Sequence, residues 1–317
     1  MAFVANVAFA VAVLGNFAFS SSESAPSGHE AQSTLKCGTT LDTGTVIHLS
    51  DGTYQRCASV ITPQSANGPM PVLFWFHGAG GSAASCGTNQ TGELAKLGEQ
   101  HGFVLICGEA LQHVFGRGGF WTIPEIITDA TGTPCEDGDS LEVPYVKAIL
   151  AWLAERPETY DTSRLFFSGC SMGSGLSNYI TTCMKRLSPA NISAFATHST
   201  GLKQRGDGLK WPHDIFHPQY MSGECPGCQY FPAIPEAHHD RLGLKACIFD
   251  NREDPSEEDP SFYESSLALA KAWFDLGNRA ETHFLHGGHC EIHSFADIVT
   301  CLDDGTGRLK SSEVVLV

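Results

Sequence analysis

One short segment constrains this chain more than any other: RLFFSGCSMGSG, over residues 164–175. Strand-forming residues lead into Gly-Cys-Ser-Met-Gly at 169–173, and a helical pattern follows. A Gly-x-Ser-x-Gly sequence between a strand and a helix is typical of a sharp, strained turn that projects a serine hydroxyl, with small residues on either side to avoid a clash. Ser171 is therefore the predicted covalent nucleophile.

The residues after this serine carry a helical pattern. Met172, Leu176, Ile180 and Met184 recur every four residues, which predicts one apolar helix face. The N-terminus of such a helix places partial positive charge beside the serine.

Strand and helix patterns alternate along the rest of the chain. Asp51-Gly52 predicts a hairpin turn between two early strands. The other predicted strands are 72–76, 103–107, 165–167, 245–249 and 281–285, and the predicted helices lie near 92–100, 141–156 and 266–276. This order predicts an α/β fold of the α/β-hydrolase type, with a mostly parallel sheet and helices on both faces.

The 317 residues contain no repeat, linker or low-complexity stretch in the middle, which predicts a single catalytic domain over 35–317. Residues 1–22 are apolar and lead into small polar residues. They predict a secretory signal peptide cleaved between Ser20 and Ala25, with an N-terminal anchor helix as the alternative.

Composition indicates where the protein works. Twelve cysteines fit a set of disulfides in an oxidising compartment, and two sequons, at Asn89 and Asn191, agree with a secreted, extracellular glycoprotein. A formal charge of −16 disfavours nucleic acid and anionic membrane surfaces as partners. After signal cleavage we expect a monomer with no membrane contact.

A serine nucleophile needs a base that takes its proton and an acid that orients the base. In this fold the chain order is serine, acid, histidine. Asp254 lies in the loop after a late strand, and His289 follows two glycines after the next strand. These two residues complete the predicted triad. Asp250 is the alternative acid, and His286 and His293 are the alternative bases.

The oxyanion of an acyl-transfer reaction needs two backbone N–H donors. One comes from the residue after the nucleophile, Met172, and the other from the glycine-rich loop after an early strand, where Ala79 is the predicted donor. A tight turn is the purely structural alternative for this loop. The predicted chemistry uses protein groups alone, so we expect no cofactor.

Several of these motifs together resemble the secreted polyhydroxybutyrate depolymerase and feruloyl esterase group, which includes family 1 carbohydrate esterases. They are FWFHGAGG, GFVLICGEA, the Asp-x-x-Arg at 161–164, SGCSMGSG and GGH, and the resemblance runs from about Thr45 to His293. It implies ester hydrolysis through an acyl-enzyme, with Ser171, Asp254 and His289 in the positions of the triad. The acid loop DNREDP differs from the group's usual His-Gly-x-x-Asp, and the tryptophan-proline pair that often follows the group's histidine is absent.

Residues 204–240 are rich in proline, aromatics and histidine and are predicted to form a lid or substrate wall. Cys225 and Cys228 with nearby histidines have the character of zinc ligands, but in a secreted protein we expect a disulfide and no metal. Trp211 in this segment and Trp121 are predicted to bind substrate, with a packing role as the alternative. For Cys170, we expect a buried thiol or a disulfide that braces the serine turn.

The resulting hypothesis is a secreted serine esterase for small-molecule or polysaccharide-linked esters, with feruloyl or acetyl groups of plant xylan as the expected substrates. A polyhydroxybutyrate-type polyester depolymerase is the alternative enzyme. A catalytically inactive hydrolase-fold protein that binds its ligand is the alternative of another class.

Overall fold

The computed structural model of this chain describes residues 44–65, 67–85, 89–111, 119, 121, 142–187, 192–200, 203–204, 229–230, 243–253, 262–275 and 277–303. The chain divides into two units, residues 1–32 and 33–317, and all described residues belong to the second. The predicted signal peptide, most of the predicted insertion at 204–240, and the predicted site residues Trp211 and Asp254 lie outside the described residues.

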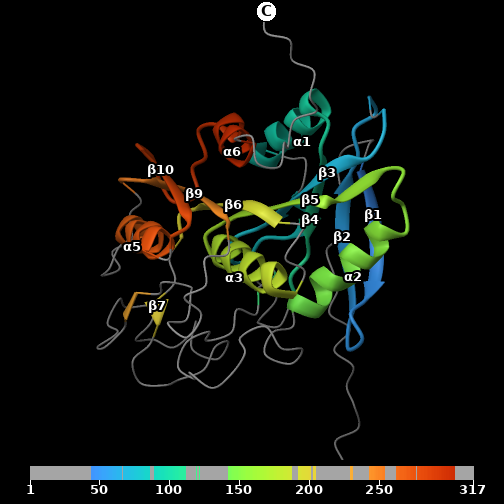
Figure 1. The fold of residues 1–317 in the computed structure, drawn as a ribbon, viewed down its shortest axis with the longest axis horizontal. Coiled ribbons are helices and arrows are strands. Elements are labelled where there is room, and N and C mark those ends of the chain that lie inside the picture. The colour runs from blue at the N-terminus through green and yellow to red at the C-terminus, as the bar shows by residue number, and fades with distance from the viewer. Residues whose placement is uncertain are drawn as a thin grey trace, which may run out of the picture. The chain divides into compact units, whose positions relative to one another are not determined.

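An eight-stranded sheet forms the centre of the described part, in the order β1-β2-β4-β3-β5-β6-β9-β10 (Figure 1). Its strands are β1 (Gly44–Ser50), β2 (Gln55–Ile61), β3 (Met70–Phe76), β4 (Val104–Gly108), β5 (Tyr160–Cys170), β6 (Ile192–His198), β9 (Lys245–Asn251) and β10 (Arg279–Leu285). The β1–β2 hairpin and the β2–β4 pair are antiparallel, and the remaining neighbours are parallel. β7 (Lys203–Gln204) and β8 (Gln229–Tyr230) pair separately. The predicted mostly parallel sheet is confirmed.

Helices cover both faces of this sheet. α1 and α6 lie on one face, and α2, α3 and α5 lie on the other (Figure 1). Their bounds, with the short 3-10 helix η1, are η1 (Ala83–Ser85), α1 (Asn89–His101), α2 (Glu142–Ala154), α3 (Met172–Leu187), α5 (Phe262–Asp275) and α6 (Phe295–Leu302). No helix in the described part of the chain combines the length and apolar character needed to cross a membrane.

Each face of the sheet has its own core, because successive side chains of a strand point to opposite faces. In β3, Phe74 and Phe76 pack with α2, α3 and α5, whereas Leu73 and Trp75 pack with α1 and α6. Burial on both faces explains why β3 appears in the sequence as a continuous apolar run. The predicted apolar face of α3 is also confirmed, since Met172, Leu176, Ile180 and Met184 are all buried in one of these cores.

Some elements differ from their predicted bounds. β5 begins at Tyr160, earlier than the predicted Leu165. Residues 161–164 are polar, so the apolar pattern in the sequence starts only at Leu165. In the structure Asp161 and Arg164 pair with each other at 2.5 Å, and Arg164 Nη2 donates to Pro69 O at 3.1 Å. α6 was not predicted; Ser294 caps it by accepting a hydrogen bond from the backbone N–H of Asp297.

The parallel strands bring the predicted catalytic loops to one edge. β3 ends just before His77, β5 just before Ser171, and β10 shortly before His289. The carboxyl ends of parallel strands meet at the same edge of a sheet, which is where open α/β sheets bind their ligands.

Candidate active site

Ser171 occupies a strained turn between β5 and α3. Its φ of 55° lies in the left-handed region, which is costly for a residue with a Cβ atom. Its backbone N–H donates to His198 O at 3.0 Å, and its carbonyl accepts from the N–H groups of Ser174 and Gly175 at 2.9 and 3.3 Å. The turn is therefore held from both sides with the serine at its apex.

The two glycines of the motif are required by close packing. A Cβ atom on Gly173 would lie 2.0 Å from Phe76 O, and one on Gly169 would lie 2.5 Å from Gly173 O. No side chain fits at these separations. The backbone of β5 and the start of α3 can approach the end of β3 only because both positions are glycine.

The glycine-rich loop after β3 lies directly against the serine. A Cβ atom on Gly78 would be 3.3 Å from Ser171 Cβ. The N–H of Gly80 donates to Gly119 O at 2.9 Å, and the N–H of Gly81 donates to Gly78 O at 3.0 Å, so neither faces the serine as a free donor. Ala79 is exposed at the apex of this loop.

Met172, the other predicted oxyanion donor, is the first residue of α3. The first N–H groups of a helix have no carbonyl partner within the helix and carry its partial positive charge. This placement suits the predicted donation from its backbone to an anionic oxygen beside Ser171.

Trp121 packs against His77, at the start of the glycine-rich loop after β3. The side chain is 1% exposed, and its Nε1–H donates to His77 O at 2.8 Å. Its ring packs edge-on to Phe76, and its backbone N–H donates to Met172 Sδ at 3.3 Å. These contacts agree with the packing alternative for Trp121, and its substrate-binding role stays a prediction.

His77 is buried at the base of the same loop. Burial lowers the pKa of its imidazole to about 4, although the hydrogen bond from Nδ1 to Gly78 O at 2.7 Å acts to raise it. Its Nε2 is buried and has no hydrogen-bond partner among the described residues. Protonation there would bury a charge with no counter-charge in contact among the described residues, so the neutral ring is the stable form.

This depressed pKa predicts that the protein loses stability in acid. Unfolded His77 takes up a proton near pH 6.5, whereas folded His77 does so only near pH 4. The contribution of His77 to the free energy of unfolding is therefore fully present above pH 6.5 and falls by roughly 3 kcal/mol as the pH drops to 4. Urea unfolding at pH 7, 5.5 and 4 measures the free energy of unfolding of the wild-type protein and of His77→Asn, whose side chain at this position cannot titrate. The wild-type protein should show this loss and the variant should not. Parallel pH dependences of the two proteins would contradict the assignment.

His289 follows β10 in a loop that several contacts fix. Its exposed ring packs on Phe262, the first residue of α5, at 4.3 Å between centroids. Asn251, at the end of β9, donates through Nδ2 to Gly288 O at 2.7 Å and to Glu291 O at 2.9 Å. Since these carbonyls lie on either side of His289, Asn251 restricts the backbone that carries the predicted base.

Ser199, just after β6, also holds the loop that carries His289. Its Oγ accepts from the N–H of Cys290 at 3.1 Å. Ser199 and Cys290 have φ angles of 53° and 58°, and with Ser171 they are the non-glycine residues of positive φ in the described part of the chain. Backbone strain therefore concentrates at the predicted site, as it does at many active sites.

A disulfide joins the serine turn to the histidine loop. Cys170 directly precedes Ser171, Cys290 directly follows His289, and their Cα atoms are 5.8 Å apart. Because consecutive Cα atoms are about 3.8 Å apart, the Cα atoms of Ser171 and His289 lie within about 13 Å of each other. Of the two expectations for Cys170, the disulfide is the one observed. A second disulfide, Cys247–Cys301, lies in the same core, on the face of the sheet that α1 and α6 cover.

The acid of the predicted triad, Asp254, lies outside the described residues. The alternative, Asp250, is 1% exposed within β9 and accepts hydrogen bonds from Asn251 N at 2.7 Å and from Ser266 Oγ of α5. The contact with Ser266 connects β9 to α5.

The alternative bases are placed differently from His289. His286 Nδ1 pairs with Glu253 Oε1 at 2.7 Å, and both side chains are exposed. His293 Nε2 donates to the backbone O of His286.

Asn251, Ser199 and Cys290 were not among the predicted site residues. The side chains of Asn251 and Ser199 bind backbone groups of the histidine loop, which is far away in the sequence, and no local sequence pattern reveals such contacts. Cys290 did have a signal, because the chain places one cysteine immediately before the predicted nucleophile and another immediately after the predicted base.

One group in the described part has the spacing of a metal site: Glu281, His283 and Cys301. Cys301 is bonded to Cys247, and Glu281 Oε2 pairs with Lys245 Nζ at 2.7 Å. The sulfur is therefore not available as a thiolate ligand.

No protein-family model matches this chain, and no curated protein matches it either. Its structure is similar to that of a ferulic acid esterase, with a TM-score of 0.55 and 13% identity over 82% of this chain and 97% of that one. An S-formylglutathione hydrolase from Agrobacterium tumefaciens gives a TM-score of 0.51 and 14% identity over 82% of this chain and 92% of that one. A thermophilic carboxylesterase cloned from a metagenomic library gives a TM-score of 0.51 and 16% identity over 79% and 81%. The predicted α/β-hydrolase fold is confirmed.

Proposed function

We propose that this protein hydrolyses carboxylic esters through an acyl-enzyme on Ser171. The observation that carries the proposal is the covalent connection between the strained serine turn and the histidine loop through Cys170–Cys290. The placement of Gly78 against Ser171 supports it, since the loop of the predicted oxyanion donor then lies beside the reacting hydroxyl. The fold shared with a carboxylesterase and a ferulic acid esterase supports it further.

In this mechanism Ser171 Oγ attacks the ester carbonyl carbon while His289 takes the hydroxyl proton. The N–H groups of Met172 and Ala79 stabilise the negative oxygen of the tetrahedral intermediate. His289 then gives the proton to the departing alcohol, which leaves the acyl group on Ser171. Water, activated by His289, releases the acid, and Asp254 holds the imidazole in the required tautomer throughout.

The substrates that we favour are feruloyl or acetyl esters of plant cell-wall polysaccharide. The sequence motifs and the fold likeness to a ferulic acid esterase support this choice. We also propose that the protein is secreted. The cysteines in the described part of the chain are disulfide-bonded, which fits an oxidising compartment.

A panel of three esters tests the activity and the substrate class. Methyl ferulate, p-nitrophenyl acetate and a hydroxybutyrate trimer should be compared by kcat/KM. We expect at least one of the first two to exceed the trimer by about 10-fold, which is about 1.4 kcal/mol of transition-state discrimination. A preference for the trimer would favour the polyester depolymerase. A folded protein that cleaves none of the three would favour the inactive binding protein and contradict the proposal.

A further inference from the structure

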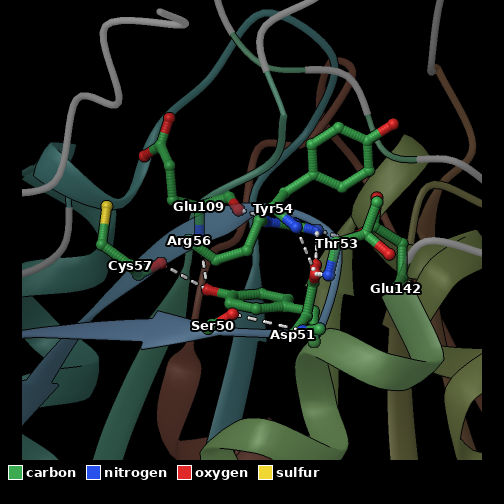
Figure 2. Close-up of polar contacts among 10 residues, drawn as sticks. Ser50, Asp51, Thr53, Tyr54, Arg56, Cys57, Glu109 and Glu142 are labelled. Atoms are coloured by element: carbon green, nitrogen blue, oxygen red, sulfur yellow. Dashed lines mark hydrogen bonds and ion pairs between the residues drawn. The ribbon is translucent and has the colours of Figure 1, made fainter.

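A buried polar cluster lies beside the end of β4. Arg56 of β2 and Glu142, the first residue of α2, are both fully buried, and Arg56 Nη2 donates to Glu142 Oε2 at 2.7 Å. The same nitrogen donates to the backbone O of Glu109 at 3.0 Å. Figure 2 shows Glu109 and Arg56 together in this cluster. A fully buried ion pair is stable only when further hydrogen bonds satisfy its charged groups. The hydrogen bond from Arg56 to Glu109 O is one of these bonds.

The backbone of Glu109 is held on both sides. Its N–H donates to the hydroxyl oxygen of Tyr145 at 3.0 Å, while its carbonyl accepts from Arg56. Tyr145 in turn donates to Cys57 O at 2.6 Å, and its ring lies under the Arg56 guanidinium at 3.9 Å. Burial raises the pKa of Tyr145, so its hydroxyl stays protonated as a donor. The position of Glu109 is thereby fixed by residues of β2 and α2.

From this fixed backbone the fully buried side chain of Glu109 reaches the glycine-rich loop. Its Oε2 accepts from the N–H of Ala83 at 2.6 Å. Ser59 Oγ donates to the carbonyl oxygen of Ala83 at 3.3 Å. Both backbone groups of Ala83 are thus held, and the bond to a carboxylate is of the stronger, charge-assisted kind.

The segment that contains the predicted oxyanion donor Ala79 begins at His77 and ends at Ala83. The middle of this segment is held by the Gly80–Gly119 and Gly119–Gly81 backbone hydrogen bonds. Its start is fixed by the end of β3, where Gly78 lies so near Ser171 that an added Cβ atom would be 3.3 Å from Ser171 Cβ. Glu109 supplies the anchor at the other end.

We propose that Glu109 is a positioning residue that holds the oxyanion loop, residues 77–83, in place against Ser171. This inference rests on the proposed ester hydrolysis, because the loop matters for catalysis only if Ala79 donates to the oxyanion. Glu109 touches no substrate in this account. It sets where the backbone N–H of Ala79 lies.

Kinetics of Glu109→Ala test this role. A small displacement of one oxyanion donor should lower kcat by about 10-fold to 100-fold and leave KM within about 2-fold. The Ki of a boronic acid that mimics the tetrahedral intermediate should rise by the same factor as kcat falls. Glu109→Gln, whose amide oxygen accepts a weaker bond, should lower kcat by only about 3-fold to 5-fold. If Glu109→Ala does not fold, Glu109→Gln decides alone, and wild-type kcat and Ki in that variant would overturn the proposal.

Asn278→Ala is the matched control. Asn278 Oδ1 accepts from the backbone N–H of Leu244 at 3.3 Å, so it is also a buried side-chain acceptor of a backbone N–H, but it lies at the opposite edge of the sheet. We expect this variant to lose stability and to keep the wild-type kcat and boronic acid Ki. If the Glu109 variants behave like this control, Glu109 is structural only and the proposal is wrong.

Hydrogen exchange separates this proposal from the proposed function. The amides of residues 78–83 should exchange about 10-fold faster in Glu109→Gln than in the wild-type protein, because the loop has lost its charged anchor. This readout needs no substrate. If the wild-type protein cleaves no ester, the proposed function fails and the exchange still decides whether Glu109 holds the loop. Unchanged exchange in the variant would overturn the inference even in an active esterase.

Discussion

Replacement of Ser171 by alanine should lower kcat/KM for ester hydrolysis by about 10⁴-fold or more, because no other group at this position can form the acyl-enzyme. The substitution removes one hydroxyl and leaves the backbone of the turn in place. Alanine meets the same cost as serine at a φ of 55°, so the free energy of unfolding should change little. Initial rates on the preferred ester, with urea unfolding of both proteins, measure the two effects.

Ser163→Ala provides the comparison for this variant. Ser163 lies in the same strand, β5, but near its beginning, where its hydroxyl donates to Asp161 at 2.5 Å. We expect wild-type rates from it. Activity above about one tenth of wild type in Ser171→Ala would show that the hydrolysis does not pass through this serine.

Removal of the Cys170–Cys290 disulfide should lower both stability and activity. The double variant Cys170→Ala/Cys290→Ala loses a cross-link that spans 120 residues, worth about 5 kcal/mol in the chain-entropy account. It also frees the histidine loop from the serine turn. Because a small misplacement of a catalytic group is costly, we expect kcat to fall by about 100-fold. Rates should be measured at a temperature where circular dichroism shows the variant folded.

The disulfide Cys247–Cys301 provides the matched control. Cys247–Cys301 spans 54 residues, so Cys247→Ala/Cys301→Ala should lose about 4 kcal/mol of stability by the same argument. It connects β9 to α6, and neither of its cysteines is next to Ser171 or His289 in the sequence. Its kcat should therefore stay near wild type. Equal losses of kcat in the two double variants would mean that the first disulfide stabilises the fold without placing the base.

The local parts of the site could be predicted from the sequence. The strand, the two glycines and the helix around Ser171 are contiguous, and the steric need for Gly169 and Gly173 follows from the turn itself. The buried strands could be predicted for the same reason, since a continuous apolar run such as that of β3 is a local signal.

The contacts that hold the loops could not be predicted, because they join residues far apart in the chain. Arg56 and Glu142 are separated by 86 positions, and Ser199 and Cys290 by 91. A charged residue in a strand, or a serine after one, is ordinarily solvent-exposed, and only tertiary packing decides otherwise. Asn251 is a similar case, since its Nδ2 group donates to carbonyls of a loop that follows the next strand.

Covalent labelling tests the central claim most directly. The protein should be treated with a fluorophosphonate ester, which reacts with activated serines, and digested for peptide mass mapping. The account predicts one adduct, on Ser171, with no labelling of Ser171→Ala and slow labelling of His289→Ala. An adduct on a different serine, or none on the folded wild-type protein, would contradict the assignment of Ser171 as the nucleophile.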